Sequence, residues 1–126
     1  MNGRILELFM KENDAWDDLI NRHSKEIPDL ENMITAIFDK KKHVDEEIIS
    51  NVNVLKNEIR EQGVHMISIR EALAEQQTYL ADEKRRVPFP VKTLMSQNAL
   101  RERIRTVEKK FLDLKCNYLN YIASAL

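Results

Sequence analysis

Residues 48–80 read IISNVNVLKNEIREQGVHMISIREALAEQQTYL, and their apolar side chains recur at alternating steps of three and four. The stripe comprises Val44, Ile48, Val52, Leu55, Ile59, Gln62, Met66, Ile69, Leu73, Gln76 and Leu80. Steps of three and four place one side chain per turn on a single face of an α-helix. Because such a face is stable only when another helix covers it, the sequence predicts long helices that pack together.

A second stripe with the same spacing lies near the C-terminus. It comprises Leu100, Ile104, Val107, Phe111, Leu114, Tyr118, Tyr121 and Ala125. The segment between the stripes, residues 86–91, reads RVPFPV and is expected to be non-helical, since each proline disfavours a helical conformation in the residue before it. We therefore expect helices over residues 44–84 and 96–125, with Ser96 as the N-cap of the latter. A start nearer Val91 is the alternative.

The first third of the chain carries another apolar face, which predicts a helix over residues 4–39. Its members are Ile5, Phe9, Trp16, Leu19 and Ile20. We expect a break near Pro28, because proline in a helix interior costs about 3 kcal/mol, although a kinked continuous helix is the alternative. Cations at residues 40–42 and anions at 45–47 favour a turn near residues 40–44. With no Gly, Pro or Asn there, one helix running through residues 28–84 is also compatible with the sequence.

These elements predict an all-α fold, an elongated antiparallel three-helix bundle of coiled-coil or spectrin-like type, in a single domain over residues 1–126. The composition agrees, with 33% charged residues and only two glycines. The layout is similar to that of spectrin repeats and syntaxin N-terminal bundles. This likeness is one of architecture, and no diagnostic motif accompanies it.

Charge is unevenly distributed, although the net charge is only −1. Residues 1–83 contain 10 basic and 18 acidic residues, whereas residues 84–110 contain 9 basic and 2 acidic ones. Within the basic segment, Arg101, Arg105 and Lys109 follow at steps of four on one helix face. This face either docks on the acidic first two helices or captures an acidic partner. We predict a protein contact rather than nucleic acid, because acidic residues are interspersed and stacking aromatic residues are missing.

Residues 85–89, Arg85-Arg86-Val87-Pro88-Phe89, resemble the short docking motif of basic residues, Val, a variable residue and Phe that protein phosphatase 1 reads. The resemblance implies partner contacts by Arg85, Arg86, Val87 and Phe89 in an extended strand. Pro88 occupies the variable position and removes an N–H that strand pairing uses. The alternative is a stiff loop whose Val87 and Phe89 cap the bundle.

Several polar or aromatic residues stand at positions with two interpretations. Gln62 and Gln76 lie on the first stripe, where polar residues either set helix register and oligomeric state or mark an exposed edge. Trp16, the only tryptophan, is either a core residue or an exposed partner anchor. We favour core packing for Trp16, since it shares a face with Phe9 and Leu19.

Catalytic and metal-binding patterns are missing from the sequence. His23, His43 and His65 lie far apart, without the spacing of helical metal ligands, and are expected to be solvated or at a boundary. The lone Cys116 is expected to be half-buried and inert, and it fits a reducing compartment. No apolar run approaches the roughly 18–20 residues of a membrane span, and residues 5–10 are too short and too acidic for a signal peptide. We therefore expect a protein without enzymatic activity, cofactor or metal, located in the cytoplasm or nucleus.

The predicted function is non-enzymatic protein–protein interaction, as a scaffold, adaptor or coiled-coil subunit of a larger assembly of cytoskeletal, kinetochore or tethering type. The expected partners are other helical proteins, a second copy of the chain or an acidic protein surface. The alternative is a helical chaperone-like protein, or a binder of nucleic acid or lipid headgroups through residues 84–110. The sequence leaves open the partner, the oligomeric state and whether the chain is part of a longer protein.

Overall fold

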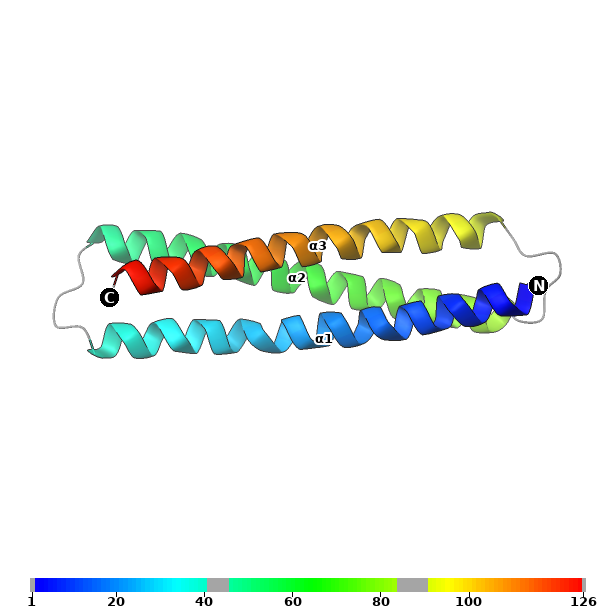
Figure 1. The fold of residues 1–126 in the computed structure, drawn as a ribbon, viewed down its shortest axis with the longest axis horizontal. Coiled ribbons are helices and arrows are strands. Elements are labelled where there is room, and N and C mark those ends of the chain that lie inside the picture. Colours follow the sequence, from blue (N-terminus) through cyan, green and yellow to red (C-terminus); the bar gives the residue numbers. More distant parts are fainter. Residues whose placement is uncertain (1, 41–45, 84–90, 126) are drawn as a thin grey trace.

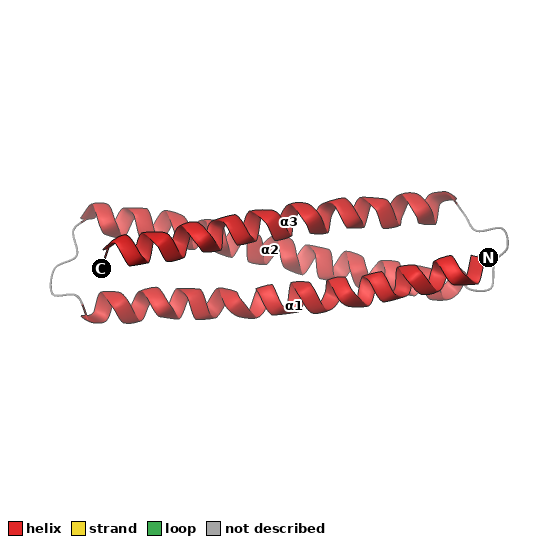
Figure 2. Cartoon of the chain, viewed as in Figure 1, coloured by secondary structure: helices red, strands yellow, loops and turns green. Residues whose placement is uncertain are grey.

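The computed structural model of the chain describes residues 2–40, 46–83 and 91–125, all of which lie in three helices. These are α1 (Asn2–Lys40), α2 (Glu46–Glu83) and α3 (Val91–Ala125). They pack lengthwise into an elongated bundle in which α2 runs opposite to α1 and α3 (Figures 1 and 2). The predicted all-α, antiparallel three-helix architecture is confirmed.

The helix α1 runs through Pro28 without interruption, so the predicted break near this residue is wrong. Pro28 is exposed, so its ring lies on the outer side of the helix, where it does not displace core side chains. On the opposite side of the same turn, Leu30 is buried and Ile27 packs against the core. Burial of this apolar face stabilises the helix enough to offset the proline, since tertiary packing contributes more to helix stability than propensity does.

The core face of α1 is shifted by one residue from the predicted face at its start. Leu6 is buried, with 2% of its surface exposed, whereas Ile5 is 36% exposed. The buried positions then step by seven from Leu6 to Asn13 to Ile20. Of the remaining predicted members, Phe9, Trp16 and Leu19 are half-buried. The buried face of α1 therefore includes a polar residue, Asn13, which a search for apolar residues alone overlooks.

The stripes predicted for α2 and α3 make up most of the core. Their buried members are Val52, Ile59, Gln62, Met66, Ile69, Leu73, Gln76, Leu80, Leu100, Ile104, Val107, Phe111, Leu114 and Tyr118. Ile48 and Leu55 are half-buried. At the end of α3 the stripe departs from the prediction, because Ile122 is buried and Tyr121 only half-buried. The 3-4 spacing thus identified the buried face over most of both helices.

The helix ends differ from the prediction mainly at α3. This helix begins at Val91, the earlier of the two starts considered, and Ser96 lies inside it. The Ser96 hydroxyl donates a hydrogen bond to the Lys92 carbonyl oxygen within the helix, so its prediction as an N-cap is wrong. Residues 28–84 form two helices rather than one, and the turn predicted near residues 40–44 falls largely on residues 41–45, outside the described residues.

Helices α1 and α2 approach closely where a glycine faces the neighbouring helix. A Cβ atom at Gly63 would lie 3.1 Å from Ile27 Cδ1.

Of the helices as described, none has a stretch that is both long and apolar enough to cross a membrane.

Candidate functional site

Three buried amide side chains, one from each helix, meet inside the bundle. Asn13, Gln76 and Gln97, hereafter the amide layer, are 2%, 7% and 0% exposed. Gln97 Nε2 donates to Asn13 Oδ1 at 2.8 Å, and Gln76 Nε2 donates to Gln97 Oε1 at 3.2 Å. Asn13 Nδ2 in turn donates to Gln77 Oε1 at 3.1 Å. Since buried polar groups are destabilising unless paired, these contacts favour the one helix register that brings the amides together.

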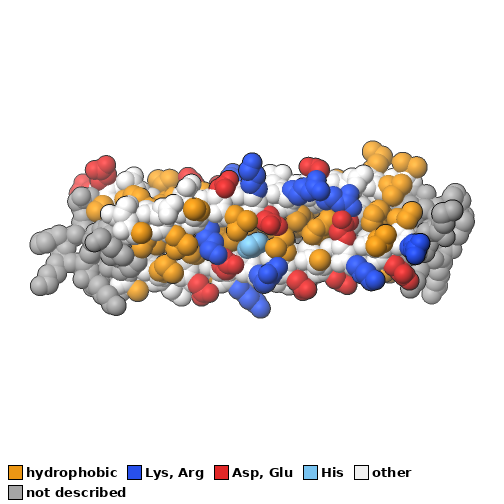
Figure 3. All heavy atoms as spheres, viewed as in Figure 1, with side chains coloured by type: hydrophobic (Ala, Val, Ile, Leu, Met, Phe, Trp, Pro, Cys, Tyr) orange, Lys and Arg blue, Asp and Glu red, His pale blue; other side chains and the backbone are white. Residues whose placement is uncertain are grey.

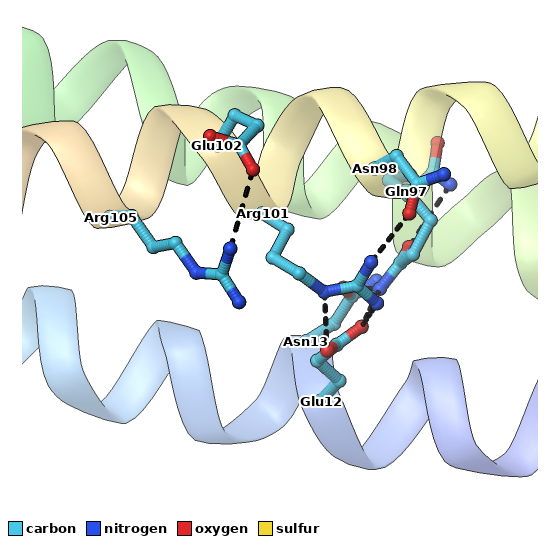
Figure 4. A network of polar contacts seen from close by, with 8 residues as sticks. Glu12, Asn13, Gln97, Asn98, Arg101, Glu102 and Arg105 are labelled. Atoms are coloured by element: carbon cyan, nitrogen blue, oxygen red, sulfur yellow. Dashed lines mark hydrogen bonds and ion pairs between the residues drawn. The ribbon is translucent and has the colours of Figure 1, made fainter.

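An ion pair between α1 and α3 borders the amide layer (Figure 4). Arg101 donates from Nε and Nη2 to the two carboxylate oxygens of Glu12, at 3.0 and 2.7 Å. Burial alone would raise the pKa of Glu12, but hydrogen bonds from Arg101 and Gln97 outweigh it and hold the pKa below its usual value. The Arg101 guanidinium carbon also lies 5.9 Å from the centre of the half-buried Trp16 ring, within cation–π range.

Two further ion pairs join α1 to its neighbours. Lys115 of α3 pairs with Glu26, and Arg60 of α2 donates to Glu31 with an Nε–Oε1 distance of 2.7 Å. The pairs Glu12–Arg101 and Glu26–Lys115 lie two heptads apart on both helices. Helices α1 and α3 therefore run parallel in one register, with cations of α2 and α3 placed on carboxylates of α1.

The three cations of the predicted basic face have different surroundings in the structure. Arg101 pairs with Glu12 of α1. Arg105 is exposed and pairs with Glu102 in its own helix, at 3.3 Å (Figure 4). Lys109 is exposed. Of these three, Arg101 alone forms an ion pair with α1 among the described residues, and binding of an external partner by the three cations stays a prediction.

Arg85, Arg86, Val87 and Phe89 fall in residues 84–90, which lie outside the described residues. Their part in partner binding stays a prediction.

His23 is buried, with 9% of its surface exposed, so the expectation of a solvated or boundary position is wrong. Its ring centre lies 4.9 Å from that of Phe111. Among the described residues neither ring nitrogen has a hydrogen-bond partner, and Glu26 Oε1 lies 3.7 Å from Nδ1, beyond hydrogen-bonding distance. The ring packs as an aromatic core residue between α1 and α3.

The other candidates for metal or thiol chemistry lie at the surface or outside the described residues. His65 is exposed, as expected, and His43 is outside the described residues. Cys116 is exposed, so its predicted half-burial is wrong. Residues 2–40, 46–83 and 91–125 contain no group of three or more His, Cys, Asp or Glu side chains that could hold a metal ion.

Large apolar side chains reach the surface at the end of the bundle where α1 and α3 begin. Ile5 and Leu8 of α1 are 36% and 59% exposed, and Val91 and Met95 of α3 are 68% and 67% exposed. We call these four residues the end patch. Figure 3 shows hydrophobic side chains gathered over this end of α1 and α3. Sequence reasoning missed the patch because it assigned Ile5 to the core and did not identify Leu8, Val91 or Met95 as exposed apolar residues.

The parallel register of α1 and α3 explains why the end patch is continuous across two helices. Ile5 lies one heptad before Glu12, and the half-buried Leu94 lies one heptad before Arg101. Because Glu12 and Arg101 are in contact, Ile5 and Leu94 occupy equivalent neighbouring positions one heptad nearer the end. The apolar surface of α1 thus adjoins that of α3.

Comparison of the chain with protein-family models, with curated proteins and with solved structures finds no match.

Proposed function

We propose that this protein is a non-enzymatic interaction module, a helical rod that presents the end patch to a partner protein as a scaffold, adaptor or subunit of a larger assembly. The end patch is the observation that carries the proposal. Ile5, Leu8, Val91 and Met95 are exposed together on adjoining helices. Contiguous apolar surface of this kind typically marks a site of interaction with another protein.

The polar groups inside the bundle support a structural role for the interior. The amide layer is hydrogen-bonded within itself, and Arg101 is engaged by Glu12. These groups hold the helices in register rather than leaving donors and acceptors directed at a ligand. Binding is therefore assigned to the outer surface.

The alternative, an acidic-ligand binder that uses residues 84–110, is less well supported. Phosphate binding depends on how many free cations a surface offers. Since Arg101 is paired with Glu12 and Arg105 with Glu102, two of the three cations on the predicted face already have carboxylate partners. We therefore favour a protein partner.

Site-specific photocrosslinking in the cells that naturally make this protein tests the proposal. A photoreactive residue at Met95 is expected to join one discrete protein, identified by mass spectrometry, whereas the same residue at the 65% exposed Val64 of α2 is not. Purified partner should then lose binding to the Leu8→Glu variant. Identical adducts at Met95 and Val64, or no adduct at any position of the end patch, would contradict an interaction at this end.

A further inference from the structure

We infer that the element bound at the end patch is an amphipathic α-helix of a partner protein whose apolar stripe is flanked on both sides by acidic side chains. The inference rests on the proposed function and adds to it the chemical class of the partner. It is carried by the positions of three exposed cations, Arg4, Lys11 and Lys92, around the four apolar residues.

On α1, cations border the patch along the side away from the core. Successive helix residues are rotated by about 100°, so Ile5 and Leu8 are about 60° apart. Arg4 and Lys11 lie roughly 40–60° beyond Leu8, on the side opposite to the buried Leu6. Both are exposed. The exposed Glu7 lies about 40° beyond Lys11, so the edge of the apolar surface on α1 is basic, with one carboxylate behind it.

On α3, the same geometry produces a second basic margin. Val91 and Met95 are about 40° apart, and Lys92 lies about 60° beyond Met95, on the side opposite to the buried Gln97. Lys92 is exposed, and the first turn of α3 contains no acidic residue. The end patch is thus an apolar band with cations along both of its long sides.

The flanking cations are available to a partner. Arg101, Lys115 and Arg60 pair with carboxylates of α1, whereas Arg4, Lys11 and Lys92 form no ion pair within the described residues. An apolar stripe with acidic margins complements this arrangement in both charge and hydrophobicity.

Charge also decides against a second copy of the chain as the occupant. A two-fold contact through the end patch would bring Arg4, Lys11 and Lys92 of one copy close to the same cations of the other, and like charges at an interface are repelled.

An anionic membrane would satisfy the charges. However, helices that bind membranes do so through an apolar face along their length, whereas here the next heptad along is the Glu12–Arg101 ion pair. A short partner helix laid over both helix starts fits the small patch.

Two labelled synthetic peptides test the inference. Each has about 21 residues with Leu at positions a and d of three heptads, and positions e and g are all Glu in one peptide and all Lys in the other. Fluorescence anisotropy with the full chain at physiological salt should show the Glu peptide binding at least about tenfold more tightly than the Lys peptide. The combined variant Arg4→Glu, Lys11→Glu, Lys92→Glu should reverse this order.

Matched variants separate local charge from net charge and from folding. The combination Lys25→Glu, Arg70→Glu, Lys110→Glu changes net charge equally at exposed sites elsewhere and should preserve the order of the two peptides. The combination Leu8→Glu, Met95→Glu should abolish binding of both. Unchanged helicity and thermal midpoint by circular dichroism verify that each variant is folded.

Each contrary result overturns the inference in a distinguishable way. Equal binding of the two peptides, unaffected by the charge reversals, would remove the acidic helix as the occupant while the crosslinking result for the proposed function still stands. No binding of the Glu peptide, or binding that persists in the Leu8→Glu, Met95→Glu variant, would likewise overturn it. Tighter binding to phosphatidylserine-containing vesicles than to the Glu peptide, lost in the Arg4→Glu, Lys11→Glu, Lys92→Glu variant, would identify a membrane instead.

Discussion

Two regions of the core hold the helices together by different means. Ile59, Ile69 and Phe111 are buried apolar side chains, and their burial is favourable at roughly 25 cal/mol per Å2 in any register that covers them. In the amide layer each hydrogen bond contributes only about 1 kcal/mol, but it forms in a single register. The comparison indicates that apolar burial drives the helices together and the amide layer selects how they align.

The amide layer lies near the end patch, so the helix register that it selects affects the proposed binding surface. It lies beside Glu12, and Glu12 is one heptad from Ile5 of the end patch. A slip of α1 against α3 would separate the two halves of the patch. The polar part of the core therefore stands where alignment matters most to the proposed binding surface.

The largest expected effect is in the apolar region. Leu73 is 3% exposed, and Leu73→Ala should lower the free energy of unfolding by roughly 2–5 kcal/mol, because the apolar contacts are lost and a cavity remains. Urea unfolding followed by circular dichroism measures this. A loss below about 0.5 kcal/mol would mean that the aliphatic core contributes much less than its burial indicates.

A smaller loss is expected when the amide layer is broken from one side. Gln97→Ala removes one hydrogen bond from Asn13, which keeps its bond to Gln77, and one from Gln76, and the resulting unpaired buried polarity is expected to lower stability by about 1–3 kcal/mol in total. The same unfolding measurement applies. A neutral result would show that water or a rotated side chain replaces the missing amide.

Replacing the whole layer distinguishes stability from alignment. The combined variant Asn13→Leu, Gln76→Leu, Gln97→Leu should be as stable as the parent or more so, since buried polar groups are exchanged for apolar ones. Its helices should nevertheless lose their unique register, seen as several masses in solution or a poorly dispersed amide spectrum. A monomer with the parent's spectral dispersion would refute the assignment of register to the amide layer.

The Glu12–Arg101 pair should have a smaller, pH-dependent effect. Because the folded-state pKa of Glu12 is lowered, its stabilising contribution is fully present above the unfolded value of about 4.3 and is lost as pH falls through the folded value. Glu12→Gln should therefore lower stability by about 1 kcal/mol or less at neutral pH. This difference should shrink toward zero in acid. A difference that stays constant from neutral to strongly acidic pH would exclude the charge as its source.

Gly63→Ala should have the smallest effect. Removing glycine from a helix interior is favourable by about 0.8–1 kcal/mol, but the new Cβ atom would lie 3.1 Å from Ile27 Cδ1. Since Ile27 is only half-buried, its terminal methyl group can shift, and a net gain below about 1 kcal/mol is expected. Adding Ile27→Val, which removes that methyl group, should raise the gain from Gly63→Ala. A loss in both backgrounds would mean that the backbones cannot accept the methyl group.

The sequence predicted α2 and α3 well because their buried positions are mostly apolar and recur at the 3-4 spacing. It failed where the spacing is carried by polar residues, as at Asn13 and His23, which only the partner helices reveal as core positions. The continuous helix at Pro28 was unpredictable for the same reason, because the packing that offsets the proline comes from other helices.

The candidate site was harder to predict than the fold. Contact of the basic segment with the acidic first helix was one of two expected outcomes, and Arg101 does pair with Glu12. The end patch was not predicted, because Ile5 and Leu6 are both apolar and only the docked register decides which of them is exposed. A polar face can be read from one helix, but an interface across two helices cannot.

The account's central claim is that one chain covers its own apolar stripes and leaves the end patch free for a different protein. Solution mass measured with small-angle scattering tests it most directly. We predict a monomer of 14.9 kDa with a radius of gyration clearly above the value of about 14 Å expected for a compact globule of this size, because the helices are roughly 55 Å long. A dimer that reverts to monomer in the Leu8→Glu variant, or a compact radius near 14 Å, would contradict it.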